Sequence, residues 1–598
     1  MAATTTSAGD NVTFNITAGG TAIPDEIRVS AIYIEKKVNR IAYAKIIILD
    51  GDADTGTFKA SSSDTFLPGT AIVIEAGYDS KNTLIFKGII TQQSLRIDAL
   101  IGSALEIECR DEAVKMVVGR KSLTYSKQKD SDVITSIIGN YSGVAADVSA
   151  TSTTWPEQVQ YYATDWDYIM TLAENNGMIV TAFDNKVSVF KPDKNTSPVL
   201  AVSYGDGLME FNASLQSLTQ LDSVKANTWD YKNQAVATGQ ATNSYAGAGN
   251  LSGKKLSEVV GLSDYQLQTT APLESADLTG WSKAQLVKSE YSKIQGEATF
   301  NGTGIPNPGQ YITLGGLGSR FNGDHIISGV VHDISDGNWI TKTDIGLPFG
   351  WFTEEPDVMA PAASGILPGV SGLSVGTVKK MYEDPDSQYR ILVNVPLFDQ
   401  NGEGIWARLA GFYATSGAGA FFLPEVGDEV VLGFLNEDPR YPVILGSLYS
   451  SPNNKPYTGL EPDEKNKLKA IVSKSGIAVE FDDENKIFTI TTPSKNTVIL
   501  SDQDKQISLK DENENSIVLS SGGITIKSPK SITIEATENI NINGTQGIKA
   551  EASGGDVAIS GMNIKQNADM QYSAEGSMSA KVSAGAELTL KGAMVMIN

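Results

Sequence analysis

The residues best suited to acid–base or nucleophilic chemistry are two histidines and one cysteine, and all three lie in strand-like sequence. His325 and His332 belong to an alternating stretch, and Cys109 ends the similar run Leu105–Cys109. A metal site or a catalytic base would have to use one of these histidines without a cysteine cluster to help. Hydrogen-bonded strand histidines and a small core cysteine are the stronger interpretation. The sequence therefore predicts no catalytic residue, no metal site and no cofactor.

Other segments resemble ligand sites only superficially. Gly247–Lys255 is similar to a phosphate-binding loop, but Lys255 stands where a Ser or Thr should bind the metal. Acidic clusters at 482–484 and 511–514 occupy turn positions, where solvated hairpin loops are expected. The carboxylates between 425 and 429 carry no feature that would separate their pKa values. None of these segments is therefore expected to bind a ligand, and the pattern of strands and turns is the more informative feature of the sequence.

From Ile524 onward the chain repeats every eight residues. The repeat visits Ile524, Ile532, Ile540, Ile548, Asp556, Ile564, Tyr572, Ala580, Leu588 and Met596. Only Asp556 is out of character, and Val557 and Ile559 beside it suggest a one-residue slip. Apolar residues also recur at i and i+2, which is the strand period with one face buried. Gly, Asn, Ser and Asp supply turns, so each unit is one short strand and one corner of a β-solenoid or intertwined β-helix.

One chain offers only a thin apolar stripe with open strand edges, which three chains wound together would close. The period alone does not exclude a single-chain solenoid, but small inward residues and the absence of Trp after Trp406 favour a narrow, shared axis. About ten repeats would give a rod about 50 Å long. We predict a homotrimer with a needle core of Ile524, Ile532, Ile540, Ile548, Ile564 and Leu588.

Composition limits the partners. The 598 residues should hold about three or four domains. A net charge of −23, spread through turns, argues against nucleic acid or anionic lipid as a partner and favours solubility. A single cysteine fits a reducing compartment. With no secretory signal and no segment long enough to span a membrane, we expect assembly in a reducing cytoplasm.

The expected fold class is mainly β, in four parts. Residues 1–360 are predicted to be mixed β with a few helices, one at 166–174 with Asp165 as its N-cap and another from Leu278 to Ile294. Gly-, Ala- and Ser-rich sequence between about 234 and 255 predicts a mobile loop. Proline and glycine clusters then separate a compact β domain, 365–455, and a linker, 456–470, from a spike, 471–598.

The middle domain carries the most specific sequence. Arg390–Pro396, Ile405–Leu409, Gly417–Phe434 and Asp438–Tyr449 occur in an order that closely resembles the OB-fold of VgrG proteins, the spikes of type VI secretion systems and related contractile injection systems. The flanks agree. Tyr161–Ile169 and Phe321–His325 resemble the family's hub, and Ser475–Asp483 resembles the start of its spike.

The resemblance implies a trimeric spike that is assembled in the bacterial cytoplasm and ejected or exported as part of the injection particle. Its hub, with one β-barrel within 10–110 and another within 200–350, would sit on the inner tube ring among baseplate proteins. An OB-fold collar and a β-helical needle would follow, and the needle would meet a target membrane only by mechanical puncture. Because no histidine after His332 can close the tip, we expect a separate PAAR-like tip protein, and effectors as cargo. Its predicted binding site is Met594, Val595, Met596, Ile597 and Asn598.

Two alternatives to a spike without catalysis are a tail spike with an enzymatic domain and a β-helical binding fibre. A tail spike with cell-wall hydrolase activity would need a spare domain of about 100 residues. Fewer than thirty residues separate Tyr449 from Ile477, and the sequence stops at Asn598, so we expect no enzyme. A β-helical adhesin or polysaccharide-binding fibre would show rows of aromatic residues. The rod has only Phe481, Phe488 and Tyr572.

Overall fold

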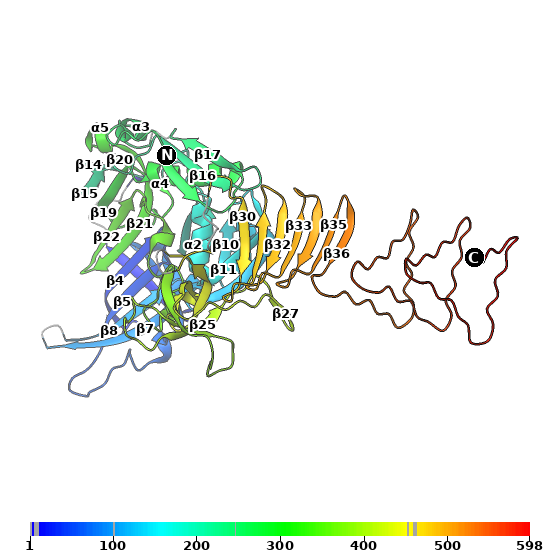
Figure 1. Ribbon diagram of the computed structural model, residues 1–598. Helices are drawn as coiled ribbons and strands as arrows, with labels where there is room; N and C mark the ends of the chain where they lie inside the picture. The colour runs from blue at the N-terminus through cyan, green and yellow to red at the C-terminus, as the bar shows by residue number, and fades with distance from the viewer. Residues whose placement is uncertain are drawn as a thin grey trace. The chain divides into compact units, whose positions relative to one another are not determined.

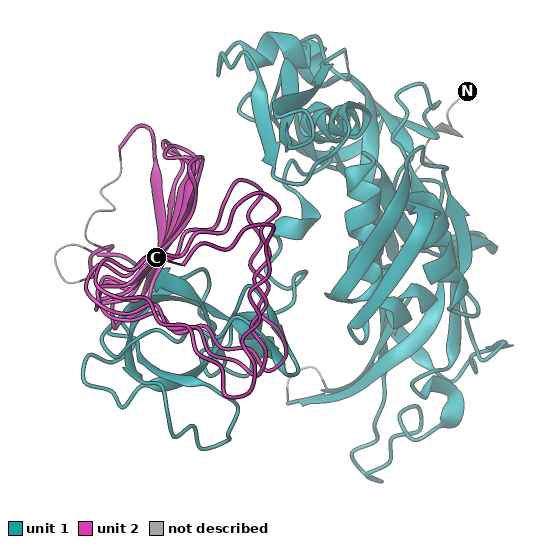
Figure 2. Cartoon of the chain, turned by 45° about the vertical axis from the view of Figure 1, so that its right-hand side comes forward, with its two compact units in different colours: residues 1–448 teal, residues 449–598 magenta. Residues whose placement is uncertain are grey.

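The protein is mainly β, with few helices, and divides into two compact units, residues 1–448 and 449–598 (Figure 2). The computed structural model describes residues 3–4, 11–99, 102–244, 247–450, 454–457 and 463–597. The first unit contains the hub and the OB-type barrel, and the second contains the needle (Figure 1). The units are described separately below.

A 14-stranded sheet forms the hub (Figure 1). Its strands are β1 (Ala3–Thr4), β2 (Val12–Ala18), β3 (Thr21–Ala22), β4 (Arg28–Lys37), β5 (Tyr43–Leu49), β6 (Ala71–Tyr78), β7 (Lys81–Asp98), β8 (Gly102–Arg110), β14 (Leu200–Tyr204), β15 (Gly207–Leu215), β19 (Ile294–Asn301), β20 (Tyr311–Gly315), β21 (Gly323–Ser335) and β22 (Asn338–Ile345). The antiparallel pair β21–β4 joins an N-terminal half to a C-terminal half. Both halves predicted from the sequence are therefore parts of one sheet.

The N-terminal half wraps around a core of its own. Inward residues of β2, β4, β5, β6, β7 and β8 meet in one apolar cluster, which also contains Trp339 of β22. Among the described residues the hydrogen-bonded strand path of this half ends at β3 and does not return to β4, so backbone pairing leaves the half-sheet open. Side chains fill the opening. Tyr78 stacks on Trp339 at 5.7 Å and donates a hydrogen bond to the Gly302 carbonyl at 3.2 Å. A Cβ at Gly302 would lie 2.1 Å from the indole, so only glycine fits there.

The C-terminal half closes on itself through hydrogen bonds. Its ring runs β14–β15–β19–β22–β21–β20 and returns to β14, because β20 pairs with both β14 and β21. Leu200, Phe300, Ile312, Ile327 and Val330 are among its fully buried core residues. This ring and the OB-type barrel described below are two closed β-barrels. The expected mainly β fold with barrels and few helices is thus confirmed, whereas the trimeric needle stays a prediction.

Helices and small sheets are inserted between the two halves of the large sheet and within each of them. They comprise η1 (Asp64–Phe66), η2 (Glu112–Val117), β9 (Lys121–Lys129), α1 (Asp130–Gly139), β10 (Ala145–Val148), β11 (Thr154–Ala163), α2 (Asp165–Asn175), β12 (Ile179–Phe183), β13 (Lys186–Phe190), β16 (Ser223–Asp230), β17 (Ala235–Thr242), α3 (Gly253–Ser257), β18 (Tyr265–Thr269), α4 (Ser275–Tyr291) and α5 (Gly318–Phe321). The N-cap of α2 is Thr164, not Asp165 as predicted, since the Thr164 hydroxyl accepts a hydrogen bond from the Asp167 backbone at 3.0 Å.

The predicted mobile loop at 234–255 is wrong for much of its length. Its first part is β17, and its end is α3. The small residues serve close packing, because a Cβ at Gly239 would lie 2.2 Å from the backbone nitrogen of Thr279 in α4. Ser282 of α4 also donates a hydrogen bond to the Gly239 carbonyl at 3.2 Å. Low side-chain volume here indicates a helix–sheet contact rather than flexibility.

A buried ion pair fixes the segment that leaves the hub. Glu174 of α2 and Lys288 of α4 are 2.6 Å apart and almost fully buried. Both also bind the chain that follows β22. The Phe352 backbone N–H donates to Glu174 at 2.7 Å, and Lys288 donates to the Gly350 carbonyl at 2.8 Å. Trp351 lies under the Lys288 ammonium at 5.0 Å. One pair of charges therefore holds two helices and the connector together.

The connector leads into a five-stranded barrel. After η3 (Phe352–Glu354) and η4 (Ala362–Gly365) come β23 (Ser374–Lys380), β24 (Ile391–Asn394), β25 (Ile405–Leu409), β28 (Glu429–Phe434), η5 (Leu435–Glu437) and β29 (Pro442–Leu448), with a hairpin of β26 (Ala414–Thr415) and β27 (Ala418–Gly419). The barrel closes in the order β23–β24–β25–β29–β28. Arg390 binds Asp384 at 2.6 and 3.0 Å, and this contact holds the pKa of the carboxyl well below its usual range.

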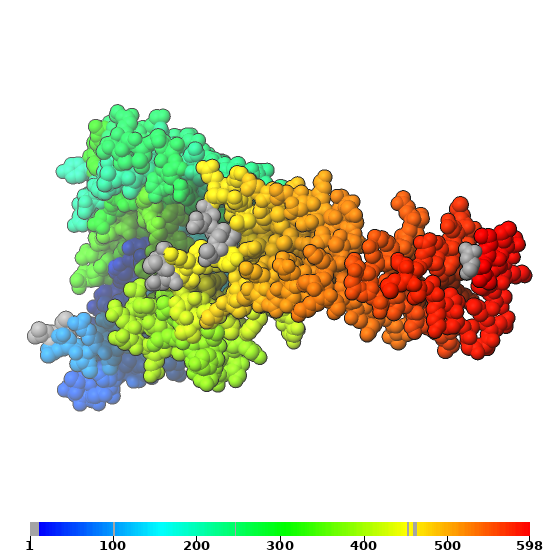
Figure 3. Space-filling model, in the orientation of Figure 1, coloured from blue at the N-terminus to red at the C-terminus, as the bar shows by residue number. Residues whose placement is uncertain are grey.

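The second unit begins as a seven-stranded antiparallel meander (Figure 1). Its strands are β30 (Leu468–Val472), β31 (Ala478–Asp482), β32 (Ile487–Thr491), β33 (Thr497–Ser501), β34 (Gln506–Lys510), β35 (Ser516–Ser520) and β36 (Gly523–Lys527). Beyond β36 the described chain makes repeated turns without a named strand. In the space-filling view this segment continues from the meander to the C-terminal end of the second unit (Figure 3).

Replacing Lys288 by Met should destabilise the hub by about 3–5 kcal/mol, because Glu174 would keep a buried charge without its partner. Urea unfolding followed by tryptophan fluorescence measures this change. The matched control is Lys255→Met, which breaks the exposed pair with Glu258 and should change stability by less than about 0.5 kcal/mol. Equal effects of the two substitutions would contradict the proposed anchoring role.

Candidate functional site

The candidate site is an apolar face of the needle that nothing in the described chain covers. Cross-strand partners in the meander lie on the same face of the sheet, as do residues i and i+2. The register therefore aligns two apolar rows on one face: Val479, Ile490, Val498, Leu509, Ile517 and Ile526, beside Phe481, Phe488, Leu500, Ile507, Leu519 and Ile524. We call these twelve residues the apolar face.

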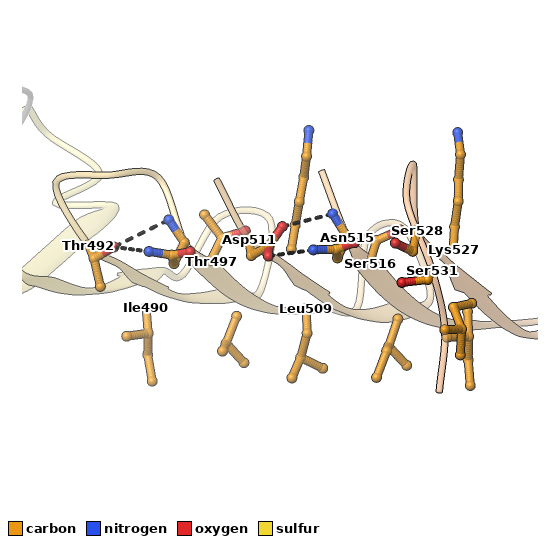
Figure 4. Close-up of a pocket in the computed structure, with 16 residues that line it drawn as sticks. Ile490, Thr492, Thr497, Leu509, Asp511, Asn515, Ser516, Lys527, Ser528 and Ser531 are labelled. Atoms are coloured by element: carbon orange, nitrogen blue, oxygen red, sulfur yellow. Dashed lines mark hydrogen bonds between the residues drawn. The ribbon is translucent and has the colours of Figure 1, made fainter. Parts of the chain in front are cut away.

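The opposite side is mainly polar, with Ile499 and Val518 among Thr and Ser side chains, and its turns are held by hydrogen bonds. Figure 4 shows Ile490 and Leu509 pointing away from the polar groups of Asp511, Asn515 and Lys527. Asn515 donates two hydrogen bonds of 2.7 Å to the Asp511 carboxylate, one from its backbone and one from its side chain. These acidic turns, predicted as solvated hairpin loops, thus stabilise the corners of the meander.

The apolar face remains open to solvent. Leu509 and Ile517 are 42% and 39% exposed, although each belongs to a central strand of the sheet. Along part of the face lies an open groove of about 560 Å3. A contiguous apolar surface of this kind marks an interface, since burying it is worth about 25 cal/mol per Å2. The geometry thus calls for a partner that covers the whole face.

The eight-residue segment continues the same pattern. Backbone bends recur at 529, 537, 545, 553, 562, 569, 577, 585 and 593, all on the eight-residue register except 562, which is displaced by one residue. The predicted corner in every repeat is therefore present. Within residues 528–597, however, no backbone hydrogen bond links one repeat to the next. A single-chain solenoid would pair its successive repeats, so this part of the chain does not form one by itself.

The predicted needle-core residues lie on the less exposed side of this segment. Ile532, Ile540 and Leu588 are 53%, 51% and 51% exposed, whereas Met578 at a corner is fully exposed. The other three predicted core residues, Ile524, Ile548 and Ile564, are also exposed in the single chain. Of the six predicted core residues, only Ile524 belongs to the apolar face of the meander.

The signal for the rest of the face is present in the sequence. Each strand from β31 to β36 carries two apolar residues two positions apart, but successive strands begin nine or ten residues apart, and β36 begins seven residues after β35, so the spacing is not a fixed eight. A search for one fixed period therefore begins at Ile524 and misses the ten residues from Val479 to Leu519. The residues predicted to bind a tip protein, Met594, Val595, Met596 and Ile597, are exposed, and Asn598 lies outside the described residues.

The two histidines and the cysteine are buried in the hub walls. His332 accepts or donates a 3.0 Å hydrogen bond with Thr341, and burial lowers the pKa of its imidazole to about 3. His325 contacts the Phe321 carbonyl at 2.7 Å, and burial lowers its pKa as well. Burial raises the pKa of the Cys109 thiol to about 12. Burial thus favours neutral imidazoles for both histidines and a protonated thiol for Cys109, which agrees with the structural roles predicted for these side chains.

One cluster of perturbed charges was missed. Burial raises the pKa of Glu290 to about 7 and lowers the pKa of Lys293 to about 8. Both lie with His325 along a crevice of about 20 Å3, which is too small for a substrate. Sequence could not indicate it, because burial at the junction of α4 and β19 causes both shifts. Within the described ranges, no group of three or more His, Cys, Asp or Glu side chains could hold a metal ion.

The closed hub ring, the OB-type barrel and the repeat-built needle together define a class of baseplate spike proteins. Residues 374–449 match the type VI secretion system/phage-baseplate injector OB domain, and residues 8–336 match the Alg8 N-terminal domain. The second match covers more than half of the chain, which therefore belongs to the Alg8 N-terminal domain family, among the VgrG-type spikes of type VI secretion and the related phage tail proteins. No helix in the described residues is long and apolar enough to cross a bilayer.

Individual relatives are similar over shorter stretches. The type VI secretion system spike protein VgrG3 of Vibrio cholerae serotype O1 is 33% identical over 107 residues, covering 17% of this chain and 10% of that protein. VgrG1b of Pseudomonas aeruginosa is 26% identical over 128 residues, covering 20% and 17%. The matched segments thus cover less than a fifth of the length of each of these two relatives. A solved E. coli type VI secretion component, c3393, has a TM-score of 0.37 at 11% identity and covers 72% of this chain and 99% of its own.

Replacing Glu290 by Gln should stabilise the hub at high pH only. Its folded-state pKa is raised to about 7 from 4.5, so stability falls as pH rises between these values and stays lower above them. The substitution should therefore add about 1–2 kcal/mol at pH 8, after discounting for partial exposure, and almost nothing at pH 4. Urea unfolding at both pH values checks this, with exposed Glu26→Gln as the control. A gain at pH 4 equal to that at pH 8 would refute the assignment.

Proposed function

We propose that the chain is one subunit of a trimeric structural spike at the tip of a contractile injection machine. The supporting observation is the apolar face, which runs from Val479 into the eight-residue segment and lacks cover within the described chain. Three copies around one axis would turn these faces toward each other. The same arrangement would supply hydrogen-bond partners for the backbone of residues 528–597.

Such a needle suits axial load. If every extended segment pairs with segments of other chains, bending or withdrawing one chain must break many hydrogen bonds at once. The exposed methionines at the corners would then lie on the outside, and Ile532 and Ile540 on the inside. This arrangement supports a role in puncturing a target envelope without a catalytic step.

The other parts fit the same role. Residues 1–360 would cap the inner tube ring and contact baseplate proteins, with 365–455 as a collar, 456–470 as a linker and 471–598 as the spike. Two half-sheets in each hub, joined by β4 and β21, would give a trimer six similar units to match a sixfold ring. A tip protein would bind Met594–Asn598, and effectors would travel with the spike.

Replacing Ile532 or Ile540 by Asp should abolish the trimer, because three unpaired charges would be buried near one axis at a cost of several kcal/mol. Size-exclusion chromatography with light scattering, in mild detergent, should find three chains per particle for the parent protein and a trimer yield at least about tenfold lower for the variants. Thr533→Asp, on the other side of the same segment, is the matched control. Parent-like assembly of Ile532→Asp and Ile540→Asp would sink the proposal.

Deleting Met594–Asn598 should leave the trimer intact and remove the tip protein. Four of these residues are exposed and apolar, which suits an interface at the end of the needle. Affinity purification of tagged spikes from cells that make the whole machine should recover a small co-purifying protein with the parent spike only. If the shortened trimer retains that protein with unchanged affinity, the binding site lies elsewhere.

A further inference from the structure

The OB-type barrel carries a hairpin that protrudes from it, formed by β26 and β27 after the end of β25 (Figure 1). The two short strands pair antiparallel, and the Ala420 backbone N–H donates a 3.0 Å hydrogen bond to the Tyr413 carbonyl just beyond them. Two aromatic residues precede β26 and two follow β27: Phe412, Tyr413, Phe421 and Phe422. We call these four residues the aromatic hairpin.

The aromatic hairpin is open to solvent. Its four side chains are between 56% and 89% exposed in the described chain. From Leu409 to Pro424 the sequence also contains no charged residue. Exposed apolar surface of this extent marks an interface, and the absence of charge leaves nothing to attract a charged partner. The hairpin therefore calls for an apolar docking surface.

The outer wall of the same barrel offers such a surface. Val375 of β23 pairs with Val431 of β28 on the outer side of the sheet, because the neighbours of Val431 point into the core. Leu373 and Leu445 flank Gly433, since a Cβ there would lie 3.9 Å from Leu373 and 3.5 Å from Leu445. The missing side chain leaves a hollow between these leucines. Leu373, Val375 and Leu445 are 68%, 43% and 51% exposed, and we call them the barrel patch.

The two surfaces are the two halves of a head-to-tail contact. Within one chain the aromatic hairpin does not cover the barrel patch, because both are exposed. A protruding group and a separate hollow on identical subunits favour a contact in which each subunit gives one and receives the other, and such contacts close into rings. A second copy of this chain is thus the partner that carries the complementary surface.

We infer that the aromatic hairpin of one subunit docks on the barrel patch of the next, with an aromatic ring over the hollow at Gly433. Three such contacts would close a collar around the axis. The inference rests on the trimer proposed above and adds a contact outside the needle. Full burial of four aromatic side chains removes on the order of 600 Å2 from water, near the about 800 Å2 that each partner contributes to a standard interface.

Cysteine cross-linking of the full-length protein tests this contact. Phe421→Cys chains and Leu445→Cys chains carry different affinity tags, are made in the same cells and are treated with a short bismaleimide. The native Cys109 is buried and should not react. Covalent dimers with both tags should form in at least about tenfold higher yield than dimers from either variant alone. Gln400→Cys, on the exposed loop before β25, replaces Phe421→Cys in the matched control and should give no dimer.

Filling the hollow provides a second test. Gly433→Leu in the Leu445→Cys chain should reduce the mixed cross-link at least about fivefold and leave the trimer intact, because the new side chain occupies the place of the docked ring. A cross-link yield unchanged by Gly433→Leu would overturn the inference. Cross-linking of Phe421→Cys chains to one another in equal yield would do the same, since it indicates a contact between two hairpins.

Light scattering of the parent protein separates this inference from the proposed function. A trimer that gives no mixed cross-link, either with this pair or with Phe412→Cys and Leu373→Cys, would overturn the docking of the hairpin and leave the trimeric spike standing. A monomeric parent protein would overturn both. A trimer with the mixed cross-link, sensitive to Gly433→Leu, is the expected result.

Discussion

The organisation of this molecule depends on hydrogen bonds and apolar surface that the needle leaves unpaired within one chain. In residues 528–597, extended segments and bends alternate without a ladder between repeats. The meander before them presents a fully apolar face to solvent. Neither feature is tolerable for an isolated chain, because unpaired strand edges and open apolar faces promote association. The spike is thus best regarded as a fold completed by assembly.

The hub, in contrast, forms complete hydrophobic cores within one chain. Its two halves share one sheet through β4 and β21, and the C-terminal half closes by backbone pairing alone. The N-terminal half closes instead by Trp339, Tyr78 and a glycine that lets them meet. The ion pair of Glu174 and Lys288 then ties the connector to the helices, so a load on the barrel reaches the hub through charged contacts rather than a loose linker.

Much of this architecture follows from sequence periodicity, and the exceptions have physical causes. The bends every eight residues appear where the repeat predicts them, and the buried histidines keep structural roles. The segment 234–255 was misassigned because Gly239 was taken as a sign of flexibility, whereas it accommodates a helix. The apolar pairs of the meander escaped notice because their spacing varies. The pKa values of Glu290 and Lys293 are shifted only through tertiary burial, which no local pattern encodes.

The pairing of β4 with β21 also sets an order of events on the ribosome. Lys37 pairs with Gly329, almost three hundred residues later, so the β4 edge of the N-terminal half-sheet stays unpaired until β21 has been synthesised. The OB-type barrel needs only the short stretch from β23 to β29. Long-range pairing of this kind is slow and exposes nascent chains to mispairing with neighbours. The hub strands are all synthesised once β22 is made, so the hub can close its own open edge before the apolar face of the needle leaves the ribosome.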